Sequence, residues 1–206
     1  MIAAGLSSRM GEFKPLLDIG GKPAVFRLLD SISAADIEDI IVVTGHKHDV
    51  IEAALKRAGN HRLSTIYNEN FALGMFSSIQ AGIRAASGYD AALLFPVDVP
   101  LVSAETITGL INAWEGTPAR PDAPFAVPVF KDKNGHPLLI PSGRFGEIAT
   151  YTGEGGLKAI RDKYADTMLR YDSGDEGCVL DIDTPEDYAS IREYYGSFGY
   201  YEQKRK

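Results

Sequence analysis

Short apolar runs alternate with amphipathic stretches along most of this sequence. The runs at 39–45 and 91–98 are apolar and end at Gly45 and Asp98, which is typical of buried parallel strands. Stretches 49–58, 77–86 and 104–114 instead repeat apolar residues three and four positions apart, which predicts surface helices. This alternation of strands and helices indicates an α/β fold.

Later segments extend the same pattern. The runs at 125–130, 137–140 and 178–182 predict further strands, and 185–194 predicts a closing helix. Segment 115–124 is rich in Pro, Gly and Ala but too short for an interdomain linker, so we interpret it as a surface loop. We therefore predict one domain over residues 1–200 and a polar, disordered tail at 201–206.

Composition narrows the classes of protein that fit. The 206 residues carry a formal net charge of −7, which argues against electrostatic capture of nucleic acid. The single cysteine, Cys178, excludes an internal disulfide, and no apolar run reaches the roughly 18 residues of a membrane span. We also expect no signal peptide, because residues 1–5 run straight into a glycine turn without a basic stretch and an apolar core. We expect a cytoplasmic protein with neither nucleic acid nor membrane among its partners.

Segment 3–15, AAGLSSRMGEFKP, combines glycines with positive charge. Gly5 and Gly11 allow sharp turns, so that backbone N–H groups can face an anion, and Arg9 and Lys14 add two cations. The spacing matches neither a Walker A loop nor the Gly-x-Gly-x-x-Gly of dinucleotide-binding folds. A glycine turn with two solvated cations is the plain alternative.

This segment resembles the signature loop of the GT-A-like nucleotidyltransferases, most closely that of the molybdenum cofactor cytidylyltransferases, which are relatives of the molybdopterin guanylyltransferases. Further segments resemble that branch in the same order: Asn68 with GMFSSI at 74–79, PVDVPL at 96–101, GHP at 135–137 and DIDTPED at 181–187. The resemblance spans nearly the whole chain. It implies a single-domain, Rossmann-like GT-A nucleotidyltransferase fold, with a mixed, mostly parallel sheet flanked by helices.

One departure from the family concerns the first strand. Members of the family have several apolar strand residues before Ala-Ala-Gly, whereas Met1 and Ile2 alone precede Ala3 here. We therefore expect a short or truncated first strand, which leaves open an upstream start, a trimmed chain or excision from a longer protein.

Asp98 and Asp183 are the candidate metal ligands. Asp98 follows an apolar strand at the edge where open α/β sheets bind ligands, and a carboxylate there suits Mg²⁺. A cap on the following turn is the alternative. Asp181 and Asp183 flank Ile182 on one face of the predicted strand, so one of them could complete the metal site. Alternatively, Asp183 or Thr184 caps the next helix.

The resemblance also implies which residues bind the nucleotide. Glycine at position 74 gives a flexible turn, and the two serine hydroxyls after it can hydrogen-bond a base or a ribose, with simple helix capping as the alternative. The implied nucleotide-binding set is Ala3, Ala4, Gly5, Arg9, Lys14, Gly74, Ser77 and Ser78.

The GHP motif is implied to lie beside the acceptor, through Gly135 and His136, with a purely structural histidine as the alternative. His46 and His48 have no carboxylate or cysteine at ligand spacing, so we assign them no metal.

The reaction implied by the resemblance is Mg²⁺-dependent transfer of CMP from CTP to the terminal phosphate of molybdopterin, with release of pyrophosphate. Lys14 would stabilise the α-phosphate, Arg9 the departing pyrophosphate, and Asp98 would hold Mg²⁺. CTP is expected over GTP because the guanylyl branch carries Gly where this chain has Ala4. A molybdenum hydroxylase apoenzyme is the candidate protein partner.

Two other functions remain open at this point. A sugar, polyol or choline phosphate could replace the pterin as acceptor on the same fold. A non-catalytic carrier of molybdenum cofactor belongs to another class, but such a carrier needs no metal-bound triphosphate site.

Overall fold

The computed structural model describes residues 1–7, 9–57, 59, 62–117 and 123–203, and its core is a β-sheet in two parts. The first part is parallel and consists of β1 (Ile2–Ala3), β4 (Ile40–Thr44) and β5 (Leu63–Tyr67). The second part has an antiparallel third strand and the order β10 (Leu169–Asp172), β7 (Ala126–Phe130), β9 (Leu138–Pro141) and β6 (Ala91–Leu94).

Ile2 joins the two parts of the sheet. Its N–H donates to the carbonyl oxygen of Phe95 at 2.8 Å, and the N–H of Val97 donates back to the carbonyl oxygen of Ile2 at 3.1 Å. The segment after β6 therefore lies parallel to β1, with Ile2 opposite Pro96. The result is the mixed, mostly parallel sheet that the sequence predicts.

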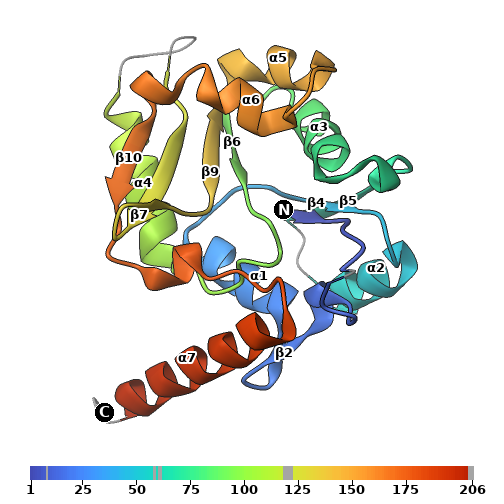
Figure 1. The fold of residues 1–206 in the computed structure, drawn as a ribbon, viewed down its shortest axis with the longest axis vertical. Coiled ribbons are helices and arrows are strands. Elements are labelled where there is room, and N and C mark those ends of the chain that lie inside the picture. Colours follow the sequence, from blue (N-terminus) through green and yellow to red (C-terminus); the bar gives the residue numbers. More distant parts are fainter. Residues whose placement is uncertain (8, 58, 60–61, 118–122, 204–206) are drawn as a thin grey trace.

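Helices cover both faces of the sheet (Figure 1). One layer consists of α3 (Met75–Ala85), α5 (Phe145–Thr150) and α6 (Gly156–Asp162), and the other of α1 (Ala24–Ala34), α2 (His48–Arg57) and α4 (Ala104–Glu115). Successive side chains of a strand point to opposite faces of the sheet, so each strand contributes apolar residues to both layers. Ile2 and Val43 cluster with residues of α3, whereas Ala3 and Val42 cluster with residues of α1.

Shorter elements complete the fold. β2 (Asp18–Ile19) and β3 (Lys22–Pro23) form a hairpin, and β8 (Lys133–Asn134) pairs with β7. The 3-10 helices are η1 (Lys14–Leu16), η2 (Phe71–Leu73), η3 (Ser142–Arg144), η4 (Ala165–Thr167) and η5 (Glu176–Val179).

The last helix, α7 (Pro185–Gln203), projects away from the sheet and packs on the β2–β3 hairpin (Figure 1). The hydroxyl of Tyr188 donates to the carbonyl oxygen of Asp18 at 2.6 Å. Residues 201–203, predicted to begin a polar, disordered tail, are helical, and 204–206 lie outside the described residues. None of the helices in the described part of the chain is long and apolar enough to cross a membrane.

The prediction of a strand at 178–182 is wrong. Here the structure has η5 and then an extended segment that joins no sheet among the described residues. Cys178 and Ile182 are fully buried, so the run is apolar because it crosses the core. Two single hydrogen bonds of 2.8 Å tie it in place, one from the His136 N–H to the Cys178 carbonyl and one from the Ile182 N–H to the Asp98 carbonyl.

Gly109 on α4 faces Tyr171 on β10, and this contact gives a test of the packing. A Cβ at Gly109 would overlap the Tyr171 hydroxyl and lie 2.6 Å from Cζ. We expect Gly109→Ala to lower the free energy of unfolding by about 1–2 kcal/mol, because overpacking outweighs the gain in helix propensity.

Urea unfolding of the single and double variants measures this effect. In a Tyr171→Val background the same substitution should become neutral or stabilising. A Gly109→Ala variant as stable as the wild type would show that α4 and β10 do not pack as described.

Candidate active site

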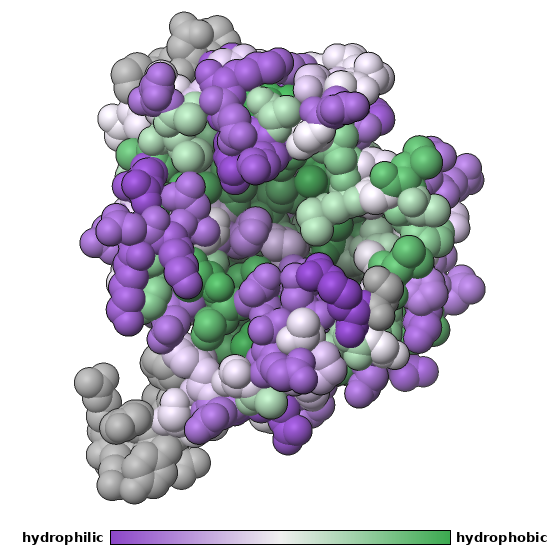
Figure 2. Space-filling model, viewed as in Figure 1, coloured by the Kyte–Doolittle hydropathy of each residue, from purple (hydrophilic) through white to green (hydrophobic). Residues whose placement is uncertain are grey.

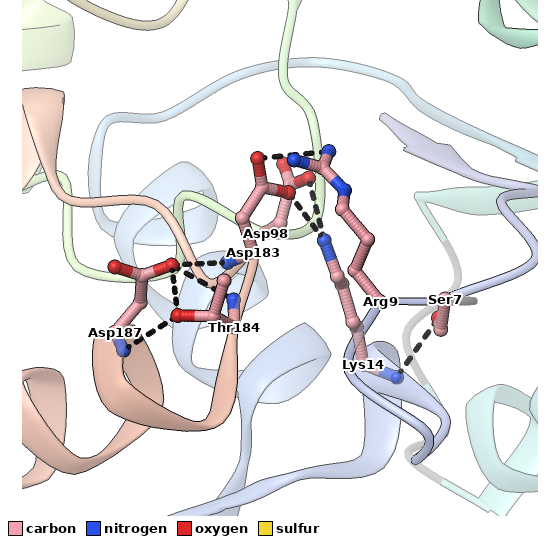
Figure 3. Close-up of polar contacts among 7 residues, drawn as sticks. All are labelled: Ser7, Arg9, Lys14, Asp98, Asp183, Thr184 and Asp187. Atoms are coloured by element: carbon pink, nitrogen blue, oxygen red, sulfur yellow. Dashed lines mark hydrogen bonds and ion pairs between the residues drawn. The ribbon is translucent and has the colours of Figure 1, made fainter.

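Two cations of the first loop meet two carboxylates from distant parts of the chain (Figure 3). The Lys14 ammonium Nζ lies 2.7 Å from Asp183 Oδ1 and 3.6 Å from Asp98 Oδ2. Arg9 Nη2 lies 2.9 Å from Asp183 Oδ2. The Lys14 side chain is 12% exposed and that of Arg9 69%, so the inner part of this cluster is shielded from solvent and the outer part is open.

The first loop is held in shape by its own backbone. Ser7 has a φ of 53°, and its carbonyl oxygen accepts the N–H groups of Met10 and Gly11. The Ser7 hydroxyl accepts the Lys14 N–H at 3.3 Å, at the start of η1. The chain therefore turns back on itself and directs Lys14 toward the carboxylates.

Asp98 and Asp183 are brought together by one hydrogen bond between main chains. Asp98 follows the segment that pairs with Ile2, and its carbonyl oxygen accepts the Ile182 N–H at 2.8 Å. The regular strand β6 ends at Leu94, earlier than predicted, so that Asp98 lies in the turn beyond the strand. This turn still lies at the carboxyl edge of the parallel strands.

A reciprocal cap at the start of α7 leaves the Asp183 carboxylate available to the cations. One Asp187 oxygen accepts the N–H groups of Asp183 (3.1 Å) and Thr184 (2.8 Å), as well as the Thr184 hydroxyl. The Asp187 N–H donates to that hydroxyl in return. Thr184 is therefore the capping residue, and Asp183 faces Lys14 and Arg9.

The two carboxyl groups differ in electrostatic environment. Burial raises the pKa of Asp98, and the nearby Lys14 ammonium opposes this change. The hydrogen bond from Lys14 lowers the pKa of Asp183, with a further contribution from Arg9. Both carboxylates contact the same ammonium group, so they converge on a single cation.

This convergence fits a divalent metal. Mg²⁺ is commonly held by one or two carboxylates together with substrate phosphate oxygens. Asp98 and Asp183 could supply the protein ligands. The described residues contain no group of three or more His, Cys, Asp or Glu side chains placed to hold a metal without such help.

The cluster lies in the wall of a cavity of about 540 Å³. Figure 2 shows the molecule hollowed near its centre, with hydrophobic residues deep inside, and with a rim that is mostly hydrophilic but hydrophobic on the right side of the view. The predicted site residues that line this cavity are Ala4, Gly5, Arg9, Lys14, Gly74, Ser78, Asp98, Gly135, His136 and Asp183. Ala3 is buried in the core, and Ser77 also lies off the cavity wall.

Asn68 holds the glycine loop beside the cavity, a role that the sequence analysis did not assign. Its side chain is buried and donates to the Ser77 and Ser78 hydroxyls, each at 2.9 Å. The Ser77 hydroxyl in turn donates to the carbonyl oxygen of either Asn70 or Gly74. The signal in the sequence that could have indicated this role is the position of Asn68 directly after a strand end, where a polar side chain faces the ligand edge of the sheet. These hydroxyls bind the loop itself, so both serines brace the cavity wall.

Phe71 was also missed, and it lines the cavity. A Cβ at Gly45 would lie 2.5 Å from the Phe71 Cβ and 3.0 Å from the Ala4 Cβ. Phe71 lines the cavity beside Ala4, Gly74 and the exposed Met75. Because glycine at 45 allows this close approach, the wall next to Ala4 is tightly packed.

Gly135 and His136 also line the cavity. Gly135 leaves no room for a side chain, since a Cβ would lie 2.6 Å from the carbonyl oxygen of Cys178. His136 Nδ1 is buried without a hydrogen-bond partner. An unpaired ring nitrogen costs least when it carries no hydrogen, which assigns the proton to Nε2. Burial, together with the charge of Arg161, lowers the pKa of His136 to about 4.

The architecture is that of the GT-A-like nucleotidyltransferase fold. Residues 1–168 match the family model described as the MobA-like NTP transferase domain, and the chain belongs to this family.

Two curated relatives illustrate its range. Nicotine blue oxidoreductase of Paenarthrobacter nicotinovorans is 26% identical over 196 residues, which are 90% of this chain and 91% of that protein. The bifunctional protein GlmU of Aquifex aeolicus (strain VF5) is 34% identical over 125 residues, 56% of this chain and 26% of that protein. The chain thus spans about a quarter of the length of this GlmU.

Solved structures show the same fold at lower identity. A nucleotidyl transferase from Methanothermobacter thermautotroptrophicus has a TM-score of 0.77 and 22% identity, covering 96% of each chain. Rv0371c of Mycobacterium tuberculosis H37Rv, in complex with manganese, has a TM-score of 0.72 and 23% identity, covering 93% of this chain and 95% of that one. For molybdopterin-guanine dinucleotide biosynthesis protein A of Archaeoglobus fulgidus the values are 0.65 and 16%, with 95% and 97% covered.

The burial of His136 predicts a specific pH dependence of stability. The folded pKa is about 4 against an ordinary 6.5, so the unfolded chain binds a proton first as the pH falls. The contribution of a neutral His136 is therefore fully present above pH 6.5 and is lost progressively between pH 6.5 and 4. His136→Gln should lack this loss.

Urea unfolding of both proteins at pH values across that interval gives the measurement. The stability of the wild type relative to His136→Gln should decrease as the pH falls. A difference that stays constant with pH would contradict the burial of a neutral imidazole.

Proposed function

We propose that this chain transfers CMP from CTP to the terminal phosphate of a molybdopterin-type acceptor, with release of pyrophosphate and with the help of Mg²⁺. The observation that carries the proposal is the meeting of Lys14 and Arg9 with Asp98 and Asp183 in one cavity wall. Two cations suit a triphosphate, and two convergent carboxylates suit its metal. Membership of the MobA-like family supports the same reaction class.

The proposed reaction is an in-line displacement at the α-phosphorus. An oxygen of the acceptor phosphate forms the new P–O bond, and the bond between the α-phosphorus and the bridging oxygen to the β-phosphate breaks. Lys14 stabilises the charge on the α-phosphate and Arg9 the charge on pyrophosphate. Mg²⁺, held by Asp98 and Asp183, would neutralise phosphate charge. The acceptor phosphate is already ionised, so no general base is needed.

Two parts of the cavity wall are proposed to bind the two substrates. The part formed by Ala4 and Phe71 would hold the base, and its tight packing against Gly45 supports a pyrimidine. Gly135 and His136 would contact the acceptor. A neutral His136 can donate one hydrogen bond from Nε2 and is unsuited to act as a base near pH 7, because its pKa is about 4.

A screen of nucleotides and acceptors tests the proposal directly. The protein is incubated with molybdenum cofactor and each of the four common NTPs, and pyrophosphate release is measured with Mg²⁺ or with a chelator. We expect kcat/KM for CTP to exceed that for GTP by about 10- to 100-fold, as one small group near the base allows. The chelator should abolish release.

The alternatives predict other outcomes of this screen. Equal or better efficiency with GTP would overturn the base assignment. Turnover with a sugar, polyol or choline phosphate but not with the pterin would change the acceptor. A protein that binds molybdenum cofactor and releases no pyrophosphate from any NTP would be a carrier, which could pass the cofactor to a molybdenum hydroxylase apoenzyme.

Lys14 separates catalysis from binding. We expect Lys14→Ala to lower kcat by about 10²- to 10³-fold, more than it weakens CTP affinity, because the ammonium meets charge that develops in the transition state. Lys14→Arg should rescue poorly, since a planar fork does not replace a compact ammonium group. Steady-state rates and CTP titrations distinguish the two roles, and they are measured on variants whose thermal unfolding matches that of the wild type. A variant that keeps its kcat and loses only affinity would make Lys14 a binding residue.

A further inference from the structure

We infer that Asp183 competes with the triphosphate for Lys14 and Arg9, so that the site binds a metal–triphosphate complex far better than a metal-free triphosphate. This inference rests on the proposed function and concerns how its nucleotide is admitted. Among the described residues, Arg9 and Lys14 are the Arg and Lys side chains that line the cavity. Asp183 pairs with both, through Oδ1 to Lys14 and Oδ2 to Arg9.

A triphosphate that arrives without a metal must break these pairs. Lys14 and Arg9 would turn to the phosphates, and Asp98 and Asp183 would be left near each other and near the triphosphate with no cation between them. The Asp98 side chain is 21% exposed and that of Asp183 28%, so solvent screens this repulsion only in part. A metal-free triphosphate therefore forms ion pairs with Lys14 and Arg9, but it leaves two carboxylates without a cation.

A divalent cation removes this cost. When it binds the two carboxylates, each charge of the cluster has a new partner, the cations on phosphate and the carboxylates on the metal. The metal and the triphosphate therefore favour each other's binding, and by reciprocity each raises the affinity for the other by the same factor.

The fold anchors the backbone of Asp183 beside the cations. Its N–H is held by Asp187 at the start of α7, and the N–H of Ile182 before it is held by the Asp98 carbonyl. The Asp183 side chain is short, so its carboxylate stays near the cations while this backbone is held. Asp181 lines the same cavity but is exposed and makes no ion pair with a described residue, which makes it a charge-matched control.

The experiment compares Asp183→Asn with Asp181→Asn by isothermal titration. The probes are CTP and inorganic triphosphate, each in a chelator and in excess Mg²⁺. Asp183→Asn removes the carboxylate that pairs with both cations and leaves Lys14 its longer contact with Asp98, so we expect it to raise the metal-free affinity for both probes by roughly 5- to 20-fold, within the usual range of coupling between ligands. Asp181→Asn removes the same charge and should change this affinity by less than about 3-fold. The enhancement by Mg²⁺ should shrink in Asp183→Asn alone.

Each outcome bears on the inference. Equal metal-free affinities in the two variants would show that net charge alone causes the effect and would overturn the inference. Weaker metal-free binding in Asp183→Asn than in the wild type would also overturn it. If inorganic triphosphate follows the expected pattern but CTP does not bind, the competition between Asp183 and the triphosphate is upheld. The assignment of cytosine as the bound base is then rejected. Failure of both probes to bind any form of the protein would reject the proposed function and the inference with it. Asp183→Ser, which keeps the backbone N–H to Asp187, replaces Asp183→Asn if that variant does not fold.

Discussion

The pairing of Ile2 with the segment after β6 is the constraint on which the candidate site depends. Two main-chain hydrogen bonds, Ile2 N–H to Phe95 O and Val97 N–H to Ile2 O, join a parallel sheet to a mixed one. The first loop leaves β1 directly after this junction, and Asp98 leaves the other strand directly after it. Lys14 and Asp98 are thus neighbours because their strands are neighbours, although more than 80 residues separate them in the sequence.

A second constraint brings the end of the chain to the same place. The apolar residues Cys178 and Ile182 fill the core, and the hydrogen bond of Ile182 to the Asp98 carbonyl positions the residue after it. Helix α7 then starts with the Thr184–Asp187 cap and anchors on the β2–β3 hairpin, which is the continuation of the first loop. The first loop, which carries the cations, and the segment that leads into α7, which carries Asp183, are therefore both anchored at the β2–β3 hairpin.

The parts that could be predicted from the sequence are those in which one physical signal dominates. Residues 40–43 are all apolar because β4 is covered on both faces, and the cation-bearing loop is marked by its glycines. The strand at 178–182 failed for a related reason, because burial alone makes a run apolar and does not show whether its backbone joins a sheet. The edge strand β10, whose residues alternate between half-buried and exposed, has no such run.

The missing parts of the site depend on contacts that a single sequence does not contain. Nothing near Asn68 in the sequence shows that its amide will meet two serine hydroxyls, and nothing near Gly45 shows that Phe71 will pack on it. Asp183 illustrates the point most clearly. Its neighbours Thr184 and Pro185 suggest a helix cap, yet the structure gives that task to Thr184 and leaves the Asp183 carboxylate on the cations.

The charge balance of this cluster explains how an acidic protein can accommodate a polyanion. The chain as a whole carries −7, so long-range attraction does not favour a triphosphate. Within the cluster formed by Arg9, Lys14, Asp98 and Asp183, the two positive and two negative charges cancel. A metal–triphosphate complex carries less negative charge than the triphosphate alone, so it meets less repulsion from the protein and replaces every ion pair that it breaks. The proposed selection of the metal-bound nucleotide would thus follow from the same four side chains that are proposed to hold it.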